Sequence, residues 1–522
     1  MKRRLVPWLF LLPFFACIPL TEGPSAPDLP DGAVSGSVDA AVPGTDAPSE
    51  QLPPGDPRGY VPERPFVSGR GRPFPEGMSR KPLGADVVFD PCPHQLPPLV
   101  HAKLTPLVDG SLADWREQGL VALDRRGDGV NGDPSRDLRA LRVATDDSYL
   151  YLGVELYGLW PQSQSAQTRL VIVLQDLAER DDSTPDGDPR RRRLFLVQRS
   201  GALWEDRSQL DGKSGPVSAD LGSSALAGST VELRLRRAAL SELSSTYVIH
   251  VALWDQRGAT AVSDNIGSYV VGYQADYTCL ITLPDGAFQT STMLRNPAVS
   301  FAQADPIYRA FIAAVPEVAR LMGSRPRVND TVNLLVVQHL LAGGVYDGLL
   351  GVMALPLLSE QPPPYTFGVM AHEAGHAYNF GDYGIRSLWA VEGHSEMLRL
   401  RALDAYFGAE VLADEVRMRR QIVKDAETQS GVVPLDLQPW PSDGYLRYSK
   451  AGLLLYGIAE LVGMPALTQA LDPRSVEGVA NFDSATLQAR LAAALSARGI
   501  TTTWQGFLFP GAYDGTPIPR PY

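Results

Sequence analysis

The stretch His372-Glu373-Ala374-Gly375-His376 places two histidines four residues apart, with a glutamate directly after the first one. On a helix, residues four apart lie on the same face, about 6 Å apart along the axis. Both imidazoles can therefore reach one cation, and the glutamate can reach a water bound to that cation. These residue types at this spacing predict a catalytic Zn2+ site, with His372 and His376 as ligands and Glu373 as the general base.

The residues around this stretch predict a helix with a defined start and end. Three prolines at 362–364 block an earlier start, and Thr366 is a candidate N-cap. Gly381 offers a stop after the motif. Gly375 lies inside the helix, where glycine costs about 1 kcal/mol relative to alanine, so we expect close packing there. Four residues at helical spacing form an apolar stripe, namely Phe367, Met370, Ala371 and Ala374.

A second predicted helix, from Ser387 to Phe407, supplies a third ligand, Glu392. Glu396 lies one turn further along the same face. From there its carboxylate could accept a hydrogen bond from the non-ligating nitrogen of a zinc histidine, which would fix the orientation of that ring. A salt bridge from Glu396 to Arg399 or Arg401 is an equally good interpretation of this glutamate.

A third run, Tyr448-Ser449-Lys450-Ala451-Gly452, opens an apolar helix that we expect between Leu453 and Val462. A phenol at the start of a helix beside the zinc could donate a hydrogen bond to a developing oxyanion. This makes Tyr448 a candidate catalytic residue. The alternative is an ordinary half-buried tyrosine.

The order of these motifs resembles that of gluzincin metallopeptidases, the group that includes aminopeptidase N, leukotriene hydrolase and the glycyl aminopeptidases. HExxH, W-x-x-E-G and Y-x-K-G of that group correspond here to HEAGH, WAVEG and YSKAG. The resemblance implies a thermolysin-like zinc peptidase domain. It further implies that His372, His376 and Glu392 are the zinc ligands. Glu373 would be the general base, and Tyr448 would donate a hydrogen bond in the transition state.

Two features compete with this resemblance. Aminopeptidases carry Gly-x-Met-Glu-Asn before the zinc helix, and its Glu holds the free amine of the substrate. Ala354 occupies that position here, so an endopeptidase or an unusual specificity is as well supported as an aminopeptidase. In metzincins the third ligand follows the second histidine by six positions, where this chain has Asp382. The metzincin pattern has glycine at the position of Asn379. Glu392 is therefore the preferred third ligand, and Asp382 is the alternative.

The N-terminus predicts export. Basic residues at 2–4 precede an apolar run at 5–16, which is typical of a secretory signal and too short to span a bilayer as a mature helix. The end of this run resembles a bacterial lipobox, which would make Cys17 the lipidated first residue; ordinary cleavage nearby is the alternative. Residues 18–90 are rich in Pro, Gly, Asp and Ser and predict a disordered tether. We expect a protein of the bacterial cell envelope, anchored to the outer membrane or cell surface.

Residues 91–284 predict an all-β antiparallel sandwich. Apolar residues alternate with other residues between Leu150 and Leu156, which is the period of a half-buried strand. Cys92 and Cys279 bracket this segment, and an even pair of cysteines in an exported protein predicts a disulfide. Further strands separated by turn-rich stretches are expected at 170–174, 194–197, 231–235 and 248–254.

The same segment resembles family-nine-like carbohydrate-binding modules. Residues 108–115 carry D-G-x-x-x-D-W, and residues 143–152 carry D-D-x-Y-L-Y. The resemblance implies a glycan ligand, although a fold by itself does not specify its function. The aromatic residues available for stacking on a sugar are equally good core residues, namely Trp160, Trp204 and Trp254.

Residues 285–522 predict an α+β, mainly helical domain, with a helix at 305–322 and a β-rich run at 331–338 before the motif helices. A net charge of −12 without a long basic run after the signal argues against nucleic acid as a partner. The sequence therefore predicts a surface-anchored zinc metallopeptidase that hydrolyses peptides or proteins. The competing hypothesis is a non-catalytic lipoprotein that binds a glycan or surface partner and carries a degenerate peptidase domain.

Overall fold

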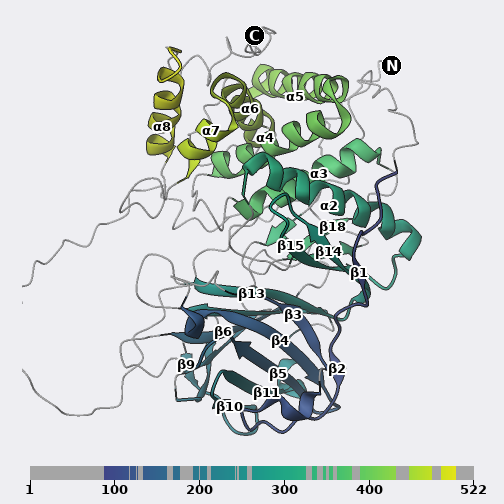
Figure 1. The fold of residues 1–522 in the computed structure, drawn as a ribbon, viewed down its shortest axis with the longest axis vertical. Coiled ribbons are helices and arrows are strands. Elements are labelled where there is room, and N and C mark those ends of the chain that lie inside the picture. Colours follow the sequence, from purple (N-terminus) through teal and green to yellow (C-terminus); the bar gives the residue numbers. More distant parts are fainter. Residues whose placement is uncertain are drawn as a thin grey trace, which may run out of the picture.

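The fold is described from a computed structural model, in which strands form three six-stranded sheets and most helices come later in the chain. Figure 1 shows the strands of the sandwich in its lower half and the helices above them. A β-rich N-terminal part followed by a mainly helical part is therefore confirmed. The described residues are 88–116, 118–124, 126, 133–160, 168–176, 192–198, 200–207, 213–241, 243, 246–254, 262–324, 332–337, 345–347, 352–356, 361–378, 388–430, 446–472 and 484–500.

Two of the sheets face each other as a sandwich. The first sandwich sheet has the order β10-β11-β5-β4-β2 with β3 beside β4, and the second has the order β13-β12-β6-β7-β8-β9. Leu150, Leu152 and Val154 on β5 are fully buried between the sheets, as their alternation predicts. The strands are β2 (Ala102–Lys103), β3 (Leu120–Leu123), β4 (Leu138–Thr145), β5 (Tyr149–Leu156), β6 (Arg169–Asp176), β7 (Arg192–Val197), β8 (Leu203–Arg207), β9 (Lys213–Pro216), β10 (Gly222–Ala227), β11 (Thr230–Arg236), β12 (Tyr247–Trp254) and β13 (Val262–Val271).

The D-G-x-x-x-D-W segment has a structural role in the sandwich. The buried carboxylate of Glu232 on β11 accepts a hydrogen bond from Trp115 Nε1 at 2.7 Å. It also accepts hydrogen bonds from the backbone N–H groups of Asp109, Gly110 and Ser111, at 2.8–3.1 Å. These bonds hold the segment against the first sandwich sheet. The D-G-x-x-x-D-W motif therefore has a structural role that does not depend on a ligand. The side chain of Trp160 is also buried, at 1 % exposure.

The third sheet, called here the catalytic-half sheet, has the order β1-β14-β15-β16-β18-β17. β15, β16 and β18 run parallel to one another, and the outer strands pair antiparallel. Because β14 pairs with β15, the chain passes from the sandwich to this sheet at the β13–β14 turn, before residue 285. The strands are β1 (Gln95–Leu96), β14 (Gln274–Thr282), β15 (Phe288–Arg295), β16 (Asn333–Val337), β17 (Val345–Asp347) and β18 (Val352–Pro356).

The helices pack around two central ones, α3 and α4. α2 begins with a capping box between Ser300 and Gln303 and ends at Gly323, which has a positive φ. No helix among the described residues is long and apolar enough to cross a membrane. The helices are α2 (Phe301–Met322), α3 (Pro363–Ala377), α4 (Leu388–Phe407), α5 (Ala409–Ser430), α6 (Ala451–Val462), α7 (Met464–Leu471) and α8 (Ser484–Ser496).

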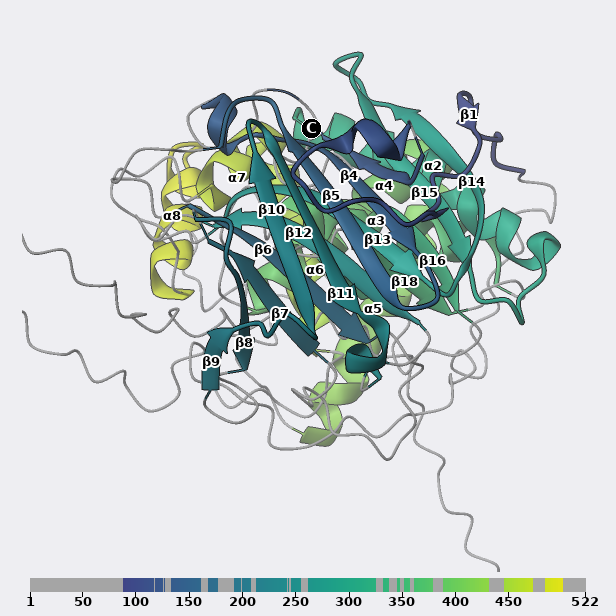
Figure 2. The same ribbon diagram turned by 90° about the horizontal axis from the view of Figure 1, so that it is seen from below.

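A small apolar cluster joins the second sandwich sheet to the catalytic-half sheet. Val248 and Val270 from β12 and β13 are buried against Leu294 on β15 and Leu335 on β16. The amide of Asn333 on β16 donates a hydrogen bond to a backbone carbonyl of β13. Figure 2 shows β13 and β16 close together from below, as Figure 1 does for β13 and β15 from the side. The two parts of the chain therefore pack together face to face.

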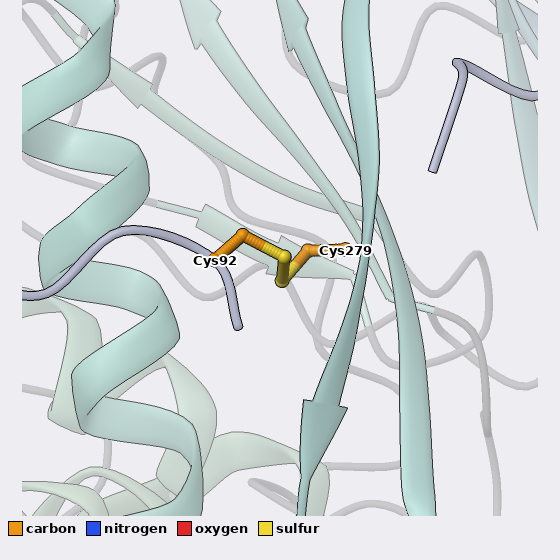
Figure 3. Close-up of a disulfide and its surroundings, with 2 residues drawn as sticks. All are labelled: Cys92 and Cys279. Carbon is orange, nitrogen blue, oxygen red and sulfur yellow. A yellow bond between two sulfur atoms is a disulfide. The ribbon is translucent and has the colours of Figure 1, made fainter. Parts of the chain in front are cut away.

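The first described residues form a strap across the catalytic half. β1 pairs with β14, and a disulfide joins Cys92 to Cys279 on β14, with the two Cα atoms 5.8 Å apart (Figure 3). Phe89 stacks on Phe367 of α3, with ring centroids 5.9 Å apart, and also contacts Phe407 at the end of α4. The disulfide predicted from the sequence is present, but it joins the strap to the catalytic-half sheet and does not pin the two ends of the sandwich together.

We expect removal of this disulfide to destabilise the catalytic half. The bond closes a loop with a sequence separation of 187 residues, and loss of a native disulfide costs about 2–5 kcal/mol of unfolding free energy. Hydrogen exchange of Cys92→Ser/Cys279→Ser protein should show faster exchange in β14 and α2 and unchanged exchange in β5. Equal acceleration in β5 would contradict this assignment.

Candidate metal centre

Helix α3 carries the two histidines and lies at the centre of the catalytic half. It begins after Pro362, with prolines in its first turn, and no side chain caps it, so the predicted Thr366 cap is wrong. Proline needs no backbone N–H partner at this position, which makes a side-chain cap less necessary. The four residues of the expected apolar stripe are buried, and so is every other residue from 364 to 377. A helix buried on all sides is a core helix, which shields the histidines from bulk water.

The two histidines and Glu392 form a compact triangle of donor atoms. The Nε2 atoms of His372 and His376 lie 2.9 Å apart. Oε2 of Glu392 on α4 lies 3.5 Å from the first and 3.6 Å from the second. A tetrahedral zinc with ligands at 2.0–2.2 Å has edges of about 3.3–3.6 Å between donors. The two edges between the histidines and Glu392 fall within this range and the edge between the histidines is shorter, so the donors fit a Zn2+ ion in their chemistry, with the two rings moving slightly apart around it.

A second carboxylate lies beside this triangle. His372, Glu373 and His376 each offer a donor atom, and these atoms lie within 4.8 Å of one another. Glu373 is fully buried. Two carboxylates therefore reach the histidine pair, one from α3 and one from α4. Oε2 of Glu392 lies within 3.6 Å of both Nε2 atoms, so Glu392 can complete a set of three donors with the two histidines.

Two consecutive residues of α4 hold the outer nitrogens of the two rings. Oε1 of Glu396 lies 3.3 Å from Nδ1 of His372, and Oγ of Ser395 lies 3.1 Å from Nδ1 of His376. Such contacts fix the tautomer and the orientation of a metal-binding imidazole. Glu396 also lies 4.0 Å from Arg399, so both interpretations of this glutamate hold together. Ser395 was missed by sequence reasoning, although its place one residue before Glu396 was a usable signal.

The electric field at the histidine pair favours positive charge. Burial alone would lower the pKa of His372, but Glu396, Glu392 and Glu373 raise this pKa to about 10. Burial and the charge of His372 lower the pKa of His376 well below its ordinary value. The cluster therefore favours one positive charge on the histidine pair and not two.

Glycines of all three motifs allow the helices to approach closely. A Cβ on Gly375 of α3 would lie 3.1 Å from Ser395 Cα, and one on Gly452 of α6 would lie 2.7 Å from Glu396 Cβ. A Cβ on Gly393 of α4 would lie 2.7 Å from Ala451 Cβ and 3.0 Å from its carbonyl carbon. The expected packing reason for Gly375 is thus present. These contacts bring α3, α4 and α6 within reach of one site.

Gly393→Ala should therefore force α4 and α6 apart. Overpacking of a well-packed core costs about 1–3 kcal/mol, and chemical denaturation should show a loss of this size. Adding Ala451→Gly removes the nearest clashing atom and should restore part of the stability. If Gly393→Ala alone is as stable as wild type, the close approach of these helices is wrong.

Tyr448 also lies at this site. It belongs to a π-helical turn, Leu446–Lys450, that leads into α6. Its ring centroid lies 5.9 Å from that of His372, and its side chain is almost buried. The structure therefore brings the candidate site residues of the three motifs together. Cys17 and Asp382 lie outside the described residues.

The segment with Ala354, which corresponds to Gly-x-Met-Glu-Asn of the aminopeptidases, forms a strand inside the catalytic-half sheet. Ala354 is on β18, which lies between β16 and β17, so it is not an edge strand. The edge strand is β17, which pairs antiparallel with β18 at Ala354 and lies next to α3. The short strand β17 was not predicted, because it lies in the glycine-rich run before residue 352.

No protein-family model matches the chain, and no curated protein matches its sequence. Among solved structures, an M1 zinc metallopeptidase from Deinococcus radiodurans is similar at 12% identity and a TM-score of 0.37, over 72% of this chain and 92% of that one. A mutant of it bound to a Tyr-Ser-Ala substrate is similar at 12% identity and a TM-score of 0.38, over 69% of this chain and 90% of that one. A two-domain M1 zinc metallopeptidase mutant bound to L-tryptophan is similar at 13% identity and a TM-score of 0.36, over 70% of this chain and 93% of that one.

Proposed function

We propose that this protein is a zinc-dependent metallopeptidase. The observation that carries the proposal is the triangle of His372, His376 and Glu392, with the second carboxylate of Glu373 beside it. A structural zinc site uses four protein ligands, whereas a catalytic site keeps one position for water or substrate. Three ligands and an adjacent buried base are the set that hydrolysis needs.

Each residue has a definite task in this proposal. When bound, Zn2+ supplies Lewis-acid chemistry, polarising a carbonyl oxygen and lowering the pKa of water. Glu373 accepts the proton of the attacking water on its carboxylate and then donates it to the amine of the leaving group. The hydroxyl of Tyr448 donates a hydrogen bond to the oxygen on which negative charge develops. Helix packing excludes bulk water around these groups, which strengthens their electrostatic effects.

The proposal also includes export and anchoring. The Cys92–Cys279 disulfide supports a location outside the cytoplasm, because structural disulfides persist mainly in oxidising compartments. We propose lipidation of Cys17 and attachment to the bacterial cell envelope through the segment that follows it. Mass spectrometry of the mature N-terminus tests this step. Glycan binding is left out of the proposal, because Trp160 is buried and Trp204 is partly buried against an apolar cluster of β6 and β7, while the side chain of Trp254 lies outside the described part of the structure.

Incubation of the purified protein with a mixed peptide library tests the activity. We expect cleavage that a chelator abolishes and that added Zn2+ restores. Comparing peptides with free and acetylated N-termini separates an aminopeptidase from an endopeptidase, since only the former needs a free amine. A zinc-loaded protein that cleaves none of these peptides would favour a binding protein with a degenerate catalytic site.

A further inference from the structure

The carboxylate of Glu396 is shared between two partners. Oε1 lies 3.3 Å from Nδ1 of His372, and Oε2 lies 2.6 Å from Nη2 of Arg419 on α5. The side chain of Glu396 is 1 % exposed, so protein groups must replace the water that would otherwise hold it. With Oε2 fixed by Arg419, the other oxygen is left to face the imidazole.

Arg419 is in turn held in a buried ion cluster. Glu415, one turn earlier on α5, lies 3.1 Å from Nη2 of Arg419 and 2.9 Å from Nη2 of Arg399 on α4. The four side chains alternate in charge, and none is more than 6 % exposed. We call this set, Glu396, Arg399, Glu415 and Arg419, the buried quartet. It links α4 to α5 and ends at the histidine ligand.

The quartet also contacts the zinc helix directly. Arg399 lies over the ring of Tyr365 on α3, with its guanidinium carbon 5.5 Å from the centroid. A Cβ on Gly368 would come within 2.9 Å of Arg399 Nε, so the guanidinium group occupies the space that a larger residue would fill. Gly368 is one turn before His372. Movement of the quartet would therefore disturb the backbone near the first ligand as well as its ring.

We propose that Arg419 is a positioning residue of the metal centre, which acts through Glu396 to orient His372. This inference rests on the proposed metal site but not on peptide cleavage. Arg419 does not contact any proposed ligand directly. Its effect on the metal must therefore disappear when Glu396 can no longer carry it. A purely structural link between α4 and α5 would affect stability and leave metal affinity unchanged.

The test is the Zn2+ affinity of Arg419→Met, measured by chelator competition on folded apo-protein. Loss of an outer partner of a ligand costs about 10–100-fold in metal affinity, and we expect about tenfold here. The visible spectrum of the Co2+-substituted protein should also change. Arg419→Lys, which keeps the charge, should recover most of the affinity. If Arg419→Met does not fold, Arg419→Gln serves for the same comparison.

Two other arginines are matched controls. Arg401 on α4 is mostly buried and pairs with Glu460, away from the quartet. Arg417 is exposed on α5 and pairs with Asp414. Arg401→Met should lower stability and Arg417→Met should change little, and neither should alter Zn2+ affinity. Equal losses of affinity in Arg401→Met and Arg419→Met would overturn the proposal, because they would indicate general destabilisation.

A double-mutant cycle isolates the pathway. In Glu396→Gln protein, the further change Arg419→Met should alter Zn2+ affinity by less than about twofold, since coupled residues are not additive. Additive losses would show that Arg419 acts by another route. Tight Zn2+ binding without peptide cleavage would remove the proposed activity and leave this inference standing. A wild-type protein that binds no Zn2+ would remove both.

Discussion

Glu373→Gln should reduce peptide cleavage by about 10²–10⁴-fold, which is the usual contribution of a positioned general base. The amide is similar in size to the carboxylate but cannot accept a proton from water. Bound Zn2+ should remain, because His372, His376 and Glu392 form the triangle of donors without it. The measurements are the cleavage rate of a fluorogenic peptide at saturating substrate and the zinc content by atomic absorption.

A matched control is Glu460→Gln, which alters an acidic side chain paired with Arg401 on α4 and distant in role from the triangle. It should keep nearly full activity. Two outcomes would contradict the assignment of Glu373. Full activity of Glu373→Gln would remove its role as base, and loss of the metal would make it a ligand, which its place in the donor cluster also permits.

Glu392→Ala should release most of the metal. A metal site that loses one of its three protein ligands should weaken by more than the 10–100-fold caused by loss of an outer partner, so we expect at least about 100-fold lower Zn2+ affinity. Alanine is a good helix former, so α4 should persist. Zinc content after dialysis and the dissociation constant from chelator competition measure the effect directly.

Asp382→Ala separates the two candidate third ligands. This variant should bind Zn2+ as wild type does, because Glu392 Oε2 already lies within 3.6 Å of both Nε2 atoms. The reverse pattern, with Asp382→Ala losing metal and Glu392→Ala retaining it, would favour the metzincin alternative. Circular dichroism of both variants provides the control for folding.

Local periodicity explains why the centre of the site was predictable. The spacing of His372 and His376 specifies two rings on one helical face, whatever surrounds the helix. Glu392 and Glu396 share a face of the next helix for the same reason. Alternating residues along β5 likewise indicate a strand before any partner strand is known. These features depend on neighbours within one or two turns of the chain.

Other features depend on partners distant in the sequence. Arg419 reaches Glu396 from a different helix, and no spacing rule specifies that contact. β14 resembles any strand of the sandwich, but its pairing with β15 places it in another sheet. Thr366 is a typical capping residue, yet the preceding prolines begin the helix earlier. In each case contacts between distant parts of the chain determine the structure, and the local sequence alone does not specify them.

The strap determines which part of the molecule would carry mechanical load. A pull on the chain before Val88 would pass through the Cys92–Cys279 bond into β14, and through the stacked ring of Phe89 into α3. Force would therefore enter the catalytic half first, while the sandwich would hang beyond the point of attachment and bear no tension.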